Sequence, residues 1–584
     1  MRLALAQINP TVGDLVGNLK KIIEFTNRAN EQTADLVCFP ELALCGYPPE
    51  DLLLKPAFLE DCRTVLEKLV QFSETVDTAL VVGCVDWAEG DVFNAAAVIH
   101  GGRLSAMYRK IFLPNYGVFD EKRYFRQGDN PLVCTCRGLH LGITICEDLW
   151  HPVGPAVMEI REGGAELILN LSASPYHRGK QHSRETMLGV RASDMVAYIA
   201  FVNAVGAQDE LVFDGNSIVF DERGRLIARG ASFEEDLLLV DIPPANILRT
   251  RLHDIRHRET FFMAGASEPV RRILLSAPQR RDYPPLPGTP SPSRFPALPG
   301  REEESAVYAA LTLGVHDYMR KNGFERVYLG LSGGIDSALA GAIAVDALGK
   351  EQVVGVFLPA SFTAPDNRED VQCLAQNLGI ALLEIPIEEI YQAYLKTLQS
   401  PFNQAPADLT SQNIQARIRG NLLMALANQN RGVVLTTGNK SELSVGYVTL
   451  YGDLAGGYAV LKDVLKTFIY RLARYRNQLA NSDLIPQRIF EKAPSAELKP
   501  GQKDEDDLPP YAVLDQIIER YVEQDQSLPE IAAQGLEFAL VRQIIEKIDR
   551  NEYKRRQSPP GVKITFRAFG KDRRMPIINR YQED

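Results

Sequence analysis

Short apolar runs recur along the first half of the chain, and stretches with the spacing of amphipathic helices separate several of them. Apolar runs of this length, bounded by polar and turn-forming residues, are typical of strands buried inside a layered domain. The first half is therefore expected to have the α/β fold class. The predicted strands are residues 2–7, 35–39, 79–84, 139–145, 165–171 and 197–203.

Two further pairs of apolar runs are separated by only a few residues, and each intervening turn contains glycine. Glycine suits tight turns because it adopts positive φ without a steric penalty. Each pair is therefore predicted to form a β-hairpin. The hairpins join residues 95–99 to 104–108 and residues 217–220 to 226–228.

In the second half, short apolar runs alternate regularly with longer helical stretches. This βαβ rhythm predicts a Rossmann-like parallel sheet with a ligand site at the carboxyl ends of its strands. The predicted strands are residues 326–329, 353–358, 381–385 and 433–437. The predicted helices are residues 301–322, 338–348 and 372–378, and a further helix opens at 413–419.

A glycine-rich turn joins the first predicted strand of this sheet to the helix after it. Gly333 and Gly334 let the backbone approach an anion closely. The unpaired N–H groups and the dipole of the helix start favour negative charge, and Ser332 and Ser337 add hydroxyl donors. No Gly-Lys-Ser/Thr follows, which excludes a Walker A loop. The turn is predicted to bind phosphate, and the alternative is a purely structural turn.

Three reactive or charged residues directly follow predicted strands of the first half: Glu41, Lys110 and Cys146. Strand ends can bring together side chains that are far apart in sequence. A carboxylate could then accept the thiol proton, and an ammonium could stabilise the oxyanion of a tetrahedral intermediate. Taken singly, a buried cysteine is usually core and a charged residue after a strand is usually at the surface. Together the three predict a nucleophilic site.

Composition narrows the classes of function. The chain has 584 residues, which is too long for one core and predicts at least two domains. A net charge of −11 argues against general binding to nucleic acid or membranes. Eight scattered cysteines form no disulfide framework, and no apolar run has the length of a signal peptide or a membrane span. A cytoplasmic location is therefore expected.

Prolines crowd residues 278–299, where little apolar content is found. This composition predicts a semi-rigid linker at 276–300, between a first domain at 1–275 and a second at 301–584. An arm lying across one of the domains would have the same composition, so both possibilities stay open.

An acidic run lies at residues 503–507 of the second half, and it is interpreted as a solvated loop.

The first half resembles the nitrilase family over about residues 1–270. The resemblance implies an αββα sandwich in which Glu41 is the general base, Lys110 stabilises the oxyanion and Cys146 forms an acyl thioester. Three motifs carry it: Phe39-Pro40-Glu41, Tyr108-Arg109-Lys110 and Cys146-Glu147-Asp148. The implied contacts to the amide substrate, glutamine, are Tyr116, Ser174 and Lys180, with Glu121 as a second acid supporting the base.

The second half resembles the ATP pyrophosphatases through its Ser-Gly-Gly-Ile-Asp-Ser loop, and NAD synthetases through residues 412–417, 437–442 and 462–467. With the nitrilase-type half, the whole chain resembles the glutamine-dependent NAD synthetase family. The ATP contacts implied are Gly330, Leu331, Ser332, Gly333, Gly334, Ile335, Asp336, Ser337 and Thr437. The contacts to deamido-NAD implied are Asn413, Glu442 and Lys554.

A carboxylate beside a nucleoside triphosphate suits Mg²⁺, and Glu442 is the predicted ligand, although an acid here would otherwise cap a helix. Arg417, Asp453 and Lys466 are further candidates for the site. Many ammonia-dependent relatives carry Lys before Tyr-Gly-Asp. Leu450 stands there in this chain, so that dinucleotide contact is not carried over.

The two resemblances imply a ligase that releases ammonia from glutamine and uses ATP, giving AMP and pyrophosphate, to amidate deamido-NAD. Other amidotransferases with this loop, and RNA-modifying enzymes acting on another carboxyl or carbonyl substrate, are the alternatives. One class of amidotransferase needs Cys after the initiator Met, which Arg2 excludes, and the negative charge counts against RNA. Small-molecule partners and a homo-oligomer, a dimer or larger, are expected because relatives of the second domain are dimeric.

Overall fold

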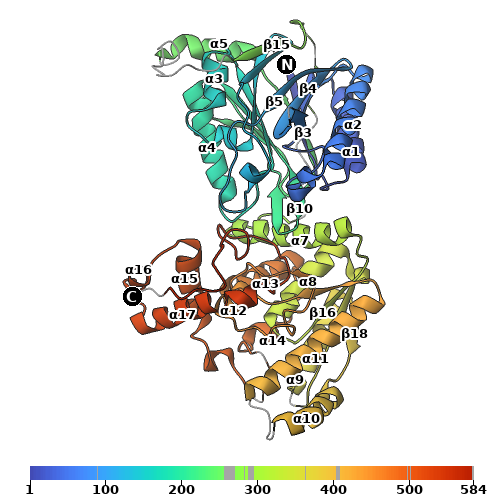
Figure 1. The fold of residues 1–584 in the computed structure, drawn as a ribbon, viewed down its shortest axis with the longest axis vertical. Helices are drawn as coiled ribbons and strands as arrows, with labels where there is room; N and C mark the ends of the chain where they lie inside the picture. The colour runs from blue at the N-terminus through green and yellow to red at the C-terminus, as the bar shows by residue number, and fades with distance from the viewer. Residues whose placement is uncertain are drawn as a thin grey trace. The chain divides into compact units, whose positions relative to one another are not determined.

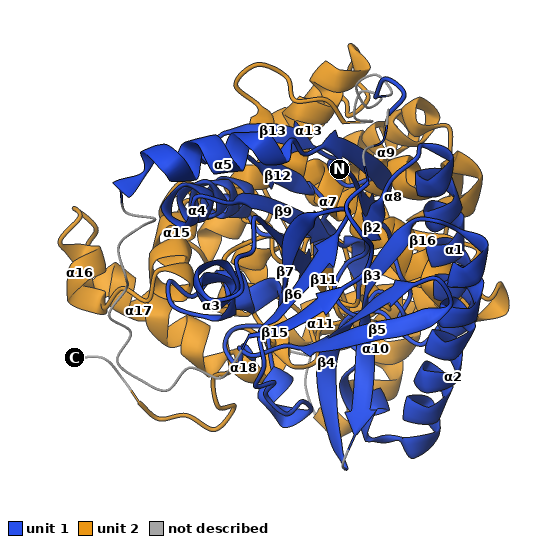
Figure 2. Ribbon diagram, turned by 90° about the horizontal axis from the view of Figure 1, so that it is seen from above, with its two compact units in different colours: residues 1–208, 212–294 blue, residues 209–211, 295–584 orange. Residues whose placement is uncertain are grey.

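The computed structural model describes the chain apart from residues 89, 256–269, 280, 282, 287–294, 362, 403–407, 496, 500 and 582–584. It divides into two compact units, coloured separately in Figure 2. The first comprises residues 1–208 and 212–294, and the second comprises residues 209–211 and 295–584. Within the described residues, no helix is both long and apolar enough to span a membrane.

Two mixed β-sheets form the centre of the first unit (Figure 1). Their central strands run parallel, and hairpins add antiparallel strands at their edges. The six-stranded sheet has the order β14 (Asp236–Asp241), β1 (Arg2–Gln7), β2 (Leu36–Cys38), β3 (Ala79–Ala88), β4 (Asp91–His100) and β5 (Arg103–Arg109). The seven-stranded sheet has the order β13 (Leu226–Arg229), β12 (Ile218–Phe220), β9 (Tyr198–Asn203), β8 (Leu167–Ser172), β7 (Leu139–Ile145), β6 (Leu132–Cys136) and β15 (Arg271–Leu274).

Helices cover the outer face of each sheet, which confirms the predicted αββα sandwich (Figure 1). Strand β8 is buried along its whole length because both of its faces are covered. Leu169 faces the core between the sheets, and Ile168 packs among residues of the covering helices. The helices are α1 (Leu15–Glu31) and α2 (Pro56–Phe72) on the six-stranded sheet, and α3 (Pro155–Arg161) and α4 (Lys180–Met195) on the seven-stranded sheet.

The predicted strands of the first half are all present, with ends that move by a few residues. Several other elements are additional to the prediction, and most of them are short or lie at a sheet edge. The antiparallel pairing of β14 with β1 joins segments more than 200 residues apart, which local periodicity does not reveal. The additional elements are β6, β14, β15, the two-stranded sheet of β10 (Val205–Gln208) and β11 (Leu211–Asp214), and α5 (Pro244–His253).

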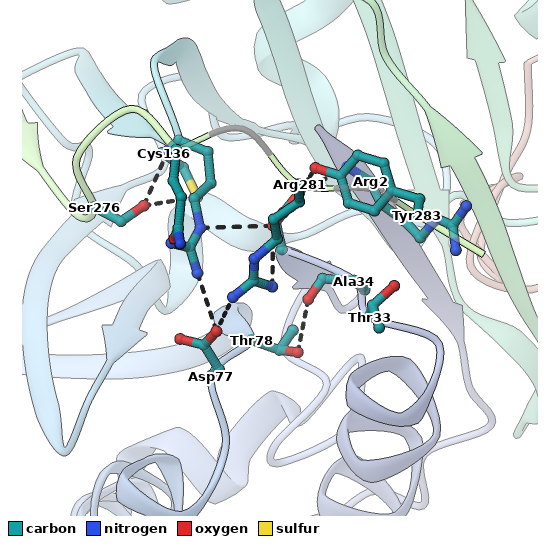
Figure 3. A network of polar contacts seen from close by, with 12 residues as sticks. Arg2, Thr33, Ala34, Asp77, Thr78, Cys136, Ser276, Arg281 and Tyr283 are labelled. Atoms are coloured by element: carbon teal, nitrogen blue, oxygen red, sulfur yellow. Dashed lines mark hydrogen bonds and ion pairs between the residues drawn. The ribbon is translucent and has the colours of Figure 1, made fainter.

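The proline-rich segment begins as an arm on the first unit. β15 pairs in parallel with β6, and Figure 3 shows the polar contacts made by the chain after it. The Tyr283 hydroxyl donates to Asp35 Oδ2 at 2.5 Å, and the Arg281 guanidinium pairs with Asp35 at 3.4 Å and with Asp77. The Arg2 guanidinium lies 5.0 Å from the centre of the Tyr283 ring. The described residues of this segment up to 286 thus behave as an arm rather than a free linker.

Tyr283→Phe is expected to lower the free energy of unfolding of the first unit by about 1–3 kcal/mol, because it removes a donor from the buried Asp35 carboxylate. The loss stays partial, since Asp35 keeps the N–H of Arg2 and the Arg281 guanidinium. Urea unfolding of the full chain, followed by hydrogen exchange in β1 and β2, measures it. Tyr581→Phe, at an exposed position, is the control. Equal stability of the two variants would contradict this role of the arm.

A five-stranded sheet, parallel throughout, forms the centre of the second unit and confirms the predicted Rossmann-like sheet (Figure 1). Its order is β18 (Ala381–Glu384), β17 (Val353–Phe357), β16 (Val327–Gly330), β19 (Val433–Thr436) and β20 (Tyr458–Ala459). Helices α8 (Ile335–Leu348) and α9 (Pro365–Leu378) lie on one face, and α11 (Asp408–Gln429) lies on the other. Helices α7 (Glu302–Asn322) and α13 (Lys466–Ala480) pack against α8.

Helices α8, α9 and α11 of this unit begin earlier than predicted, and α11 starts at Asp408 rather than at 413. Helix α8 starts at Ile335, so its first turn is part of the glycine-rich loop. Helix α9 starts at Pro365, so polar residues predicted as a loop form its first turn. Proline is favoured at the first position of a helix because no N–H is needed there. The structure therefore presents two helix starts next to the carboxyl ends of β16 and β17.

A separate apolar cluster lies in the last part of the chain. The amphipathic helix α17 (Phe538–Arg550) buries residues at helical spacing, from Val541 through Ile544 to Ile548. It packs with α12 (Lys440–Val445), α15 (Tyr511–Ile518) and α16 (Leu528–Ala532). The other helices are α10 (Glu388–Phe402), α14 (Gln487–Glu491) and α18 (Glu552–Arg555).

Candidate active sites

Cys146 lies directly after β7, on the first residue of a tight turn at Cys146–Leu149. Its φ is +41°, in the left-handed region that residues other than glycine rarely adopt. The residue is only 4% exposed. Strained backbone of this kind is concentrated at functional sites, because the surrounding structure must hold it in place.

Asp148 fastens this turn to the strand that carries Lys110. Its buried carboxylate accepts hydrogen bonds from the N–H of Ile145 at 2.9 Å, the N–H of Phe112 at 2.8 Å and the hydroxyl of Tyr108 at 2.7 Å. Ile145 precedes the cysteine, whereas the other two donors lie two residues on either side of Lys110. No role was predicted for Asp148 from the sequence, although it belongs to the Cys146-Glu147-Asp148 motif.

Asp148 also supports a pH prediction. Burial raises the pKa of Asp148 to about 6, although the Tyr108 hydroxyl and backbone N–H groups act in the opposite sense. A folded pKa above the unfolded value of about 3.9 means that the folded state binds more protons, so this contribution to stability falls as pH rises from about 4 to 6. Asparagine does not titrate. The melting-temperature difference between wild type and Asp148→Asn should therefore shrink from pH 4 to pH 7, and a constant or growing difference would contradict this assignment.

Lys110 lies between two buried carboxylates. Its Nζ is 2.6 Å from Glu41 Oε1 and 2.9 Å from both carboxylate oxygens of Glu121. Glu41 is held in turn by Asn94 Nδ2 at 2.8 Å and by the N–H of Ala173 at 3.0 Å. The predicted general base, oxyanion stabiliser and second acid therefore form one cluster, in which Glu41 lies 69 residues from Lys110 and Glu121 lies 11 residues from it.

The turn that carries Glu41 passes close to β3 at Gly83. A Cβ atom on residue 83 would lie 2.2 Å from the carbonyl oxygen of Pro40 and 2.4 Å from the backbone nitrogen of Leu42. Both are backbone atoms that cannot move aside independently. Glycine at this position therefore permits Glu41 to reach Lys110.

Burial and charge set the protonation of this cluster. Burial favours the neutral amine of Lys110, but Glu121 and Glu41 outweigh it and hold the pKa of Lys110 well above its usual range. Burial raises the pKa of Glu121 to about 7, against the effect of Lys110. Burial and then the Glu41 carboxylate raise the pKa of the Cys146 thiol, whereas Lys110 lowers it. The resting thiol is therefore protonated at neutral pH, and its attack requires a base.

The three predicted glutamine contacts lie near these groups. The Tyr116 hydroxyl donates at 2.9 Å to Oε2 of Glu147, the residue that follows Cys146. Lys180 Nζ lies 4.1 Å from the centre of the Trp150 ring. Ser174 directly follows Ala173, whose backbone N–H donates to Glu41 Oε2. The structure therefore places all three within the surroundings of the Cys146 turn.

In the second unit, the predicted phosphate loop connects β16 to α8. Gly333 has a φ of +85°, which favours glycine. The N–H of Gly334 donates to Ser332 Oγ at 3.2 Å, and Ser337 Oγ donates to the carbonyl of Gly334 at 3.0 Å. These bonds hold the loop in a compact turn at the start of a helix, where a helix dipole favours an anion.

Three of the predicted ATP contacts are not exposed side chains of the phosphate loop. Leu331 is 2% exposed, and its N–H donates to the carbonyl of Val356 at 2.9 Å, so it extends the strand pairing rather than the loop surface. Ile335 is buried by its side chain and offers only its backbone. Thr437 is half-buried and lies one residue beyond β19, the strand next to β16.

Lys466 joins two carboxylates beside this loop. Its ammonium pairs with Asp336 and lies 3.6 Å from Glu442 Oε1. The N–H of Asn439 donates to Glu442 Oε2 at 3.4 Å, and the N–H of Glu442 donates to Asn439 Oδ1 at 2.9 Å, which forms a capping box for α12. Glu442 therefore caps a helix with one oxygen and faces Lys466 with the other. Burial raises its pKa to about 8, although Lys466 opposes the shift.

The carboxylates of Asp336 and Glu442 could bind Mg²⁺ only together with ligands from the substrate and from water. Proteins commonly bind Mg²⁺ through one or two carboxylates, with substrate phosphates and water completing the octahedron. Asp336 and Glu442 supply two such oxygen donors around Lys466. Over the described part of the chain, no group of three or more His, Cys, Asp or Glu is arranged to hold a metal ion.

Comparisons with known proteins match both halves of the chain. The carbon-nitrogen hydrolase model matches residues 2–252, and the NAD synthase model matches residues 307–558. The glutamine-dependent NAD(+) synthetase of Thermotoga maritima is 48% identical to this chain, and the match covers 100% of this chain and 99% of that one. The enzyme of the same name from Aquifex aeolicus is 47% identical, and the match covers 100% of both chains. The chain belongs to the glutamine-dependent NAD(+) synthetases. A solved glutamine-dependent NAD+ synthetase from Acinetobacter baumannii, in complex with ADP, is 38% identical, with a TM-score of 0.73 over 100% of this chain and 99% of that one.

Asp504 of this NAD(+) synthetase corrects the interpretation of the acidic run. Residues 505–507 are exposed, but Asp504 is only 3% exposed. Its carboxylate accepts a hydrogen bond from the Tyr511 hydroxyl at 2.8 Å, and the Tyr511 ring lies 5.4 Å from Lys466 Nζ. The N–H of Asp504 also donates to the carbonyl of Pro494 at 2.9 Å, which folds the loop back. The solvated interpretation is therefore wrong for Asp504.

Two predicted deamido-NAD contacts of the synthetase and two further site candidates are bonded to the loop 446–453 or lie in it. Lys554 Nζ donates to the carbonyls of Gly446 at 2.6 Å and Val448 at 3.0 Å. An ammonium has three donors, so one stays available for a ligand. Burial lowers the pKa of Lys554. The other three residues are Asn413, bonded to Thr449 Oγ1, Arg417, bonded to the Leu450 carbonyl, and Asp453, bonded to the N–H of Thr449.

Proposed function

We propose that this glutamine-dependent NAD(+) synthetase releases ammonia from glutamine in its first unit and uses it in its second unit to amidate deamido-NAD. The second reaction consumes ATP and yields AMP and pyrophosphate. The observation that carries the proposal is the presence of two separate charged clusters in one chain. Lys110 pairs with Glu41 beside the Cys146 turn, and Lys466 pairs with Asp336 beside the phosphate loop.

In the first unit, Glu41 accepts the thiol proton as Cys146 Sγ attacks the amide carbon of glutamine. Lys110, held cationic by two carboxylates, stabilises the negative charge that develops on the amide oxygen. The C–N bond then breaks, ammonia leaves with the proton from Glu41, and a γ-glutamyl thioester forms on the cysteine. Water hydrolyses the thioester to glutamate. Tyr116, Ser174 and Lys180 position the glutamine, and Glu121 supports the charge of Lys110.

In the second unit, the carboxylate of deamido-NAD attacks the α-phosphorus of ATP, and the bond to pyrophosphate breaks. Ammonia then attacks the activated carbonyl carbon, and AMP leaves. Adenylation is needed because a free carboxylate offers a poor leaving group. The proposed ATP contacts are Gly330, Leu331 through its backbone, Ser332, Gly333, Gly334, Ile335, Asp336, Ser337 and Thr437, and the proposed deamido-NAD contacts are Asn413, Glu442 and Lys554.

Lys466 and the loop N–H groups are suited to the negative charge of the triphosphate. Mg²⁺, when bound, would neutralise phosphate charge, with Asp336 and Glu442 as its protein ligands.

We also propose that the protein is a cytoplasmic homo-oligomer whose partners are small molecules, and that its domains span residues 1–275 and 301–584. Size-exclusion chromatography with light scattering tests the oligomeric state.

Removing the base or the oxyanion stabiliser tests the first half of this proposal. Glu41→Gln keeps the size of the side chain but cannot accept the thiol proton, and the glutaminase rate is expected to fall by ~10²–10⁴-fold. Lys110→Ala removes the cation and is expected to cost on the order of 10²–10³-fold. Glutamate release from glutamine measures both. Glu67→Gln, on the exposed face of α2, is the control, and rates within a few-fold of wild type for either site variant would reject the assignment.

A further inference from the structure

Arg184 and Asp214 form a buried ion pair that the proposed chemistry does not use. Arg184 lies on α4, one turn after its first residue, and Asp214 is the last residue of β11. The guanidinium binds the carboxylate through two hydrogen bonds, from Nη1 to Oδ1 at 3.1 Å and from Nη2 to Oδ2 at 2.7 Å. The two residues are 0% and 1% exposed, so solvent does not screen the pair.

Stability alone is a weak explanation for this ion pair. Removing two charges from water is costly, and well-packed apolar residues of similar size often stabilise a core equally well or better. The pair is also incompletely bonded, because Arg184 Nε is buried without a hydrogen-bond partner among the described residues. A bidentate guanidinium–carboxylate contact does, however, fix the direction and distance of the two elements that it joins. The pair is therefore suited to positioning a neighbouring site.

Lys180, a proposed glutamine contact, lies on the same helix as the arginine of the pair. It is the first residue of α4, and residues four apart lie on the same face of a helix. Burial lowers the pKa of Lys180, the charge of Arg184 lowers it further and the charge of Asp214 raises it, so both charges lie close enough to act on this amine. The contact between Arg184 and Asp214 thus sets where the start of the helix places Lys180.

Asn203 connects the carboxylate of the pair to Ser174, another proposed glutamine contact. The Asn203 side chain, fully buried at the end of β9, donates through Nδ2 to Asp214 Oδ1 at 3.2 Å and to the carbonyl of Gly215 at 3.0 Å. Its Oδ1 accepts the N–H of Ser174 at 2.9 Å. The Asp214 carboxylate therefore holds α4 through Arg184 and the backbone of Ser174 through Asn203.

We infer that the Arg184–Asp214 pair positions Lys180 and Ser174 relative to each other and thereby determines the affinity of the first unit for glutamine. This inference rests on the proposed function and deepens it. Over the described part of the chain, neither member of the pair is hydrogen-bonded to the proposed base, oxyanion stabiliser or nucleophile. A misplaced glutamine contact should therefore raise KM and leave kcat nearly unchanged.

The test replaces both members of the pair at once in the full-length enzyme. Arg184→Met with Asp214→Asn nearly keeps the size of each side chain and leaves no buried charge uncompensated. KM for glutamine, measured by glutamate release, should increase by about 10–100-fold, while kcat should stay within a few-fold of wild type. The melting temperature should stay close to that of wild type. A purely structural pair would change the melting temperature or nothing, but not KM alone.

A second ion pair of the same helix is the matched control. Arg229 Nη2 binds Glu185 Oε2 at 2.8 Å and fastens α4 to β13, at a more exposed position directly after Arg184 in sequence. Arg229→Met with Glu185→Gln makes the equivalent change and should leave KM within a few-fold of wild type. Arg184→Lys keeps the buried charges balanced but cannot form the bidentate contact. It should raise KM to a smaller extent than the double replacement.

A double-mutant cycle tests whether the pair acts through Lys180. Lys180→Met should raise KM for glutamine by about 10-fold or more in the wild-type background, because a charged contact is lost. In the background of Arg184→Met with Asp214→Asn, the same replacement should cost much less, because the contact is already misplaced.

An unchanged KM in the folded double replacement would overturn the inference, and so would an equal increase of KM in the control. Additive effects of Lys180→Met and the double replacement would overturn it too. If the double replacement does not fold, Arg184→Lys decides, since it keeps the charge balance: a raised KM supports the inference and an unchanged KM overturns it. A wild-type enzyme that releases no glutamate from glutamine would instead overturn the proposed function, which all the other outcomes leave in place.

Discussion

Cys146→Ala is expected to lower NAD formation from glutamine by on the order of 10⁴-fold or more, and to leave NAD formation from ammonium salts near the wild-type rate. The variant removes the Cys146 thiol, whose pKa is affected by burial and by Glu41 and Lys110, and it changes no residue of the second unit. Ammonia supplied from solution bypasses the first reaction. Synthesis from ammonium salts should increase with pH, because the unprotonated amine is the nucleophile.

A buried structural cysteine would behave differently. Cys134→Ala, in the core between the two sheets, makes the same change of side chain away from the cluster. It should cost stability of about 1–3 kcal/mol, as the removal of a buried group does, and should affect the two nitrogen sources alike. NAD formation from each source, with thermal melting of both variants, separates the cases. Persistence of glutamine-dependent synthesis in Cys146→Ala would show that another residue is the nucleophile.

Asp336→Ala is expected to lower NAD formation from glutamine and from ammonia alike, each by at least about 10²-fold. Asp336 holds the ammonium of Lys466 and accepts a hydrogen bond from Asn439 Nδ2 at 3.1 Å. Its loss removes a proposed Mg²⁺ ligand and leaves Lys466 without its closest partner. Both nitrogen sources need the same adenylate, so neither should escape the defect.

The control for this variant is Asp366→Ala, which removes an exposed carboxylate from the first turn of α9. Glutamate release from glutamine should persist in Asp336→Ala, because the first unit is unchanged. Initial rates with each nitrogen source measure the effect. Retention of synthesis from ammonia in Asp336→Ala would place the adenylation chemistry elsewhere.

The sequence predicted the parts of this protein that depend on local pattern. Strand runs with apolar spacing located β1, β7 and β8, and the residues directly after strands identified Glu41 and Lys110 as partners. Neighbouring strands of a sheet end at the same edge. A residue directly after one strand can therefore be predicted to lie near a residue directly after another, even when the two are far apart in sequence. The glycine-rich loop was predictable from local sequence, because the positive φ of Gly333 favours glycine at that position.

Long-range contacts without a local signal escaped prediction. Asp504 lies in a run of acids whose other members are exposed, and only the folded loop turns it toward Tyr511. The sequence left open whether the proline-rich segment is a linker or an arm, because the partners of Tyr283 and Arg281, Asp35 and Asp77, lie more than 200 residues away. In both cases the composition of the segment indicated a polar or proline-rich loop, but it could not indicate which residues elsewhere in the chain the loop contacts.

The most direct test of the two-site account follows nitrogen and phosphorus in one reaction. The full chain is incubated with ATP, deamido-NAD and glutamine labelled with ¹⁵N in its amide, and the products are measured by mass spectrometry and ³¹P NMR. We expect ¹⁵N in the amide of NAD, together with one AMP and one pyrophosphate for each NAD formed. ADP and orthophosphate in their place, or NAD without the label, would contradict the account.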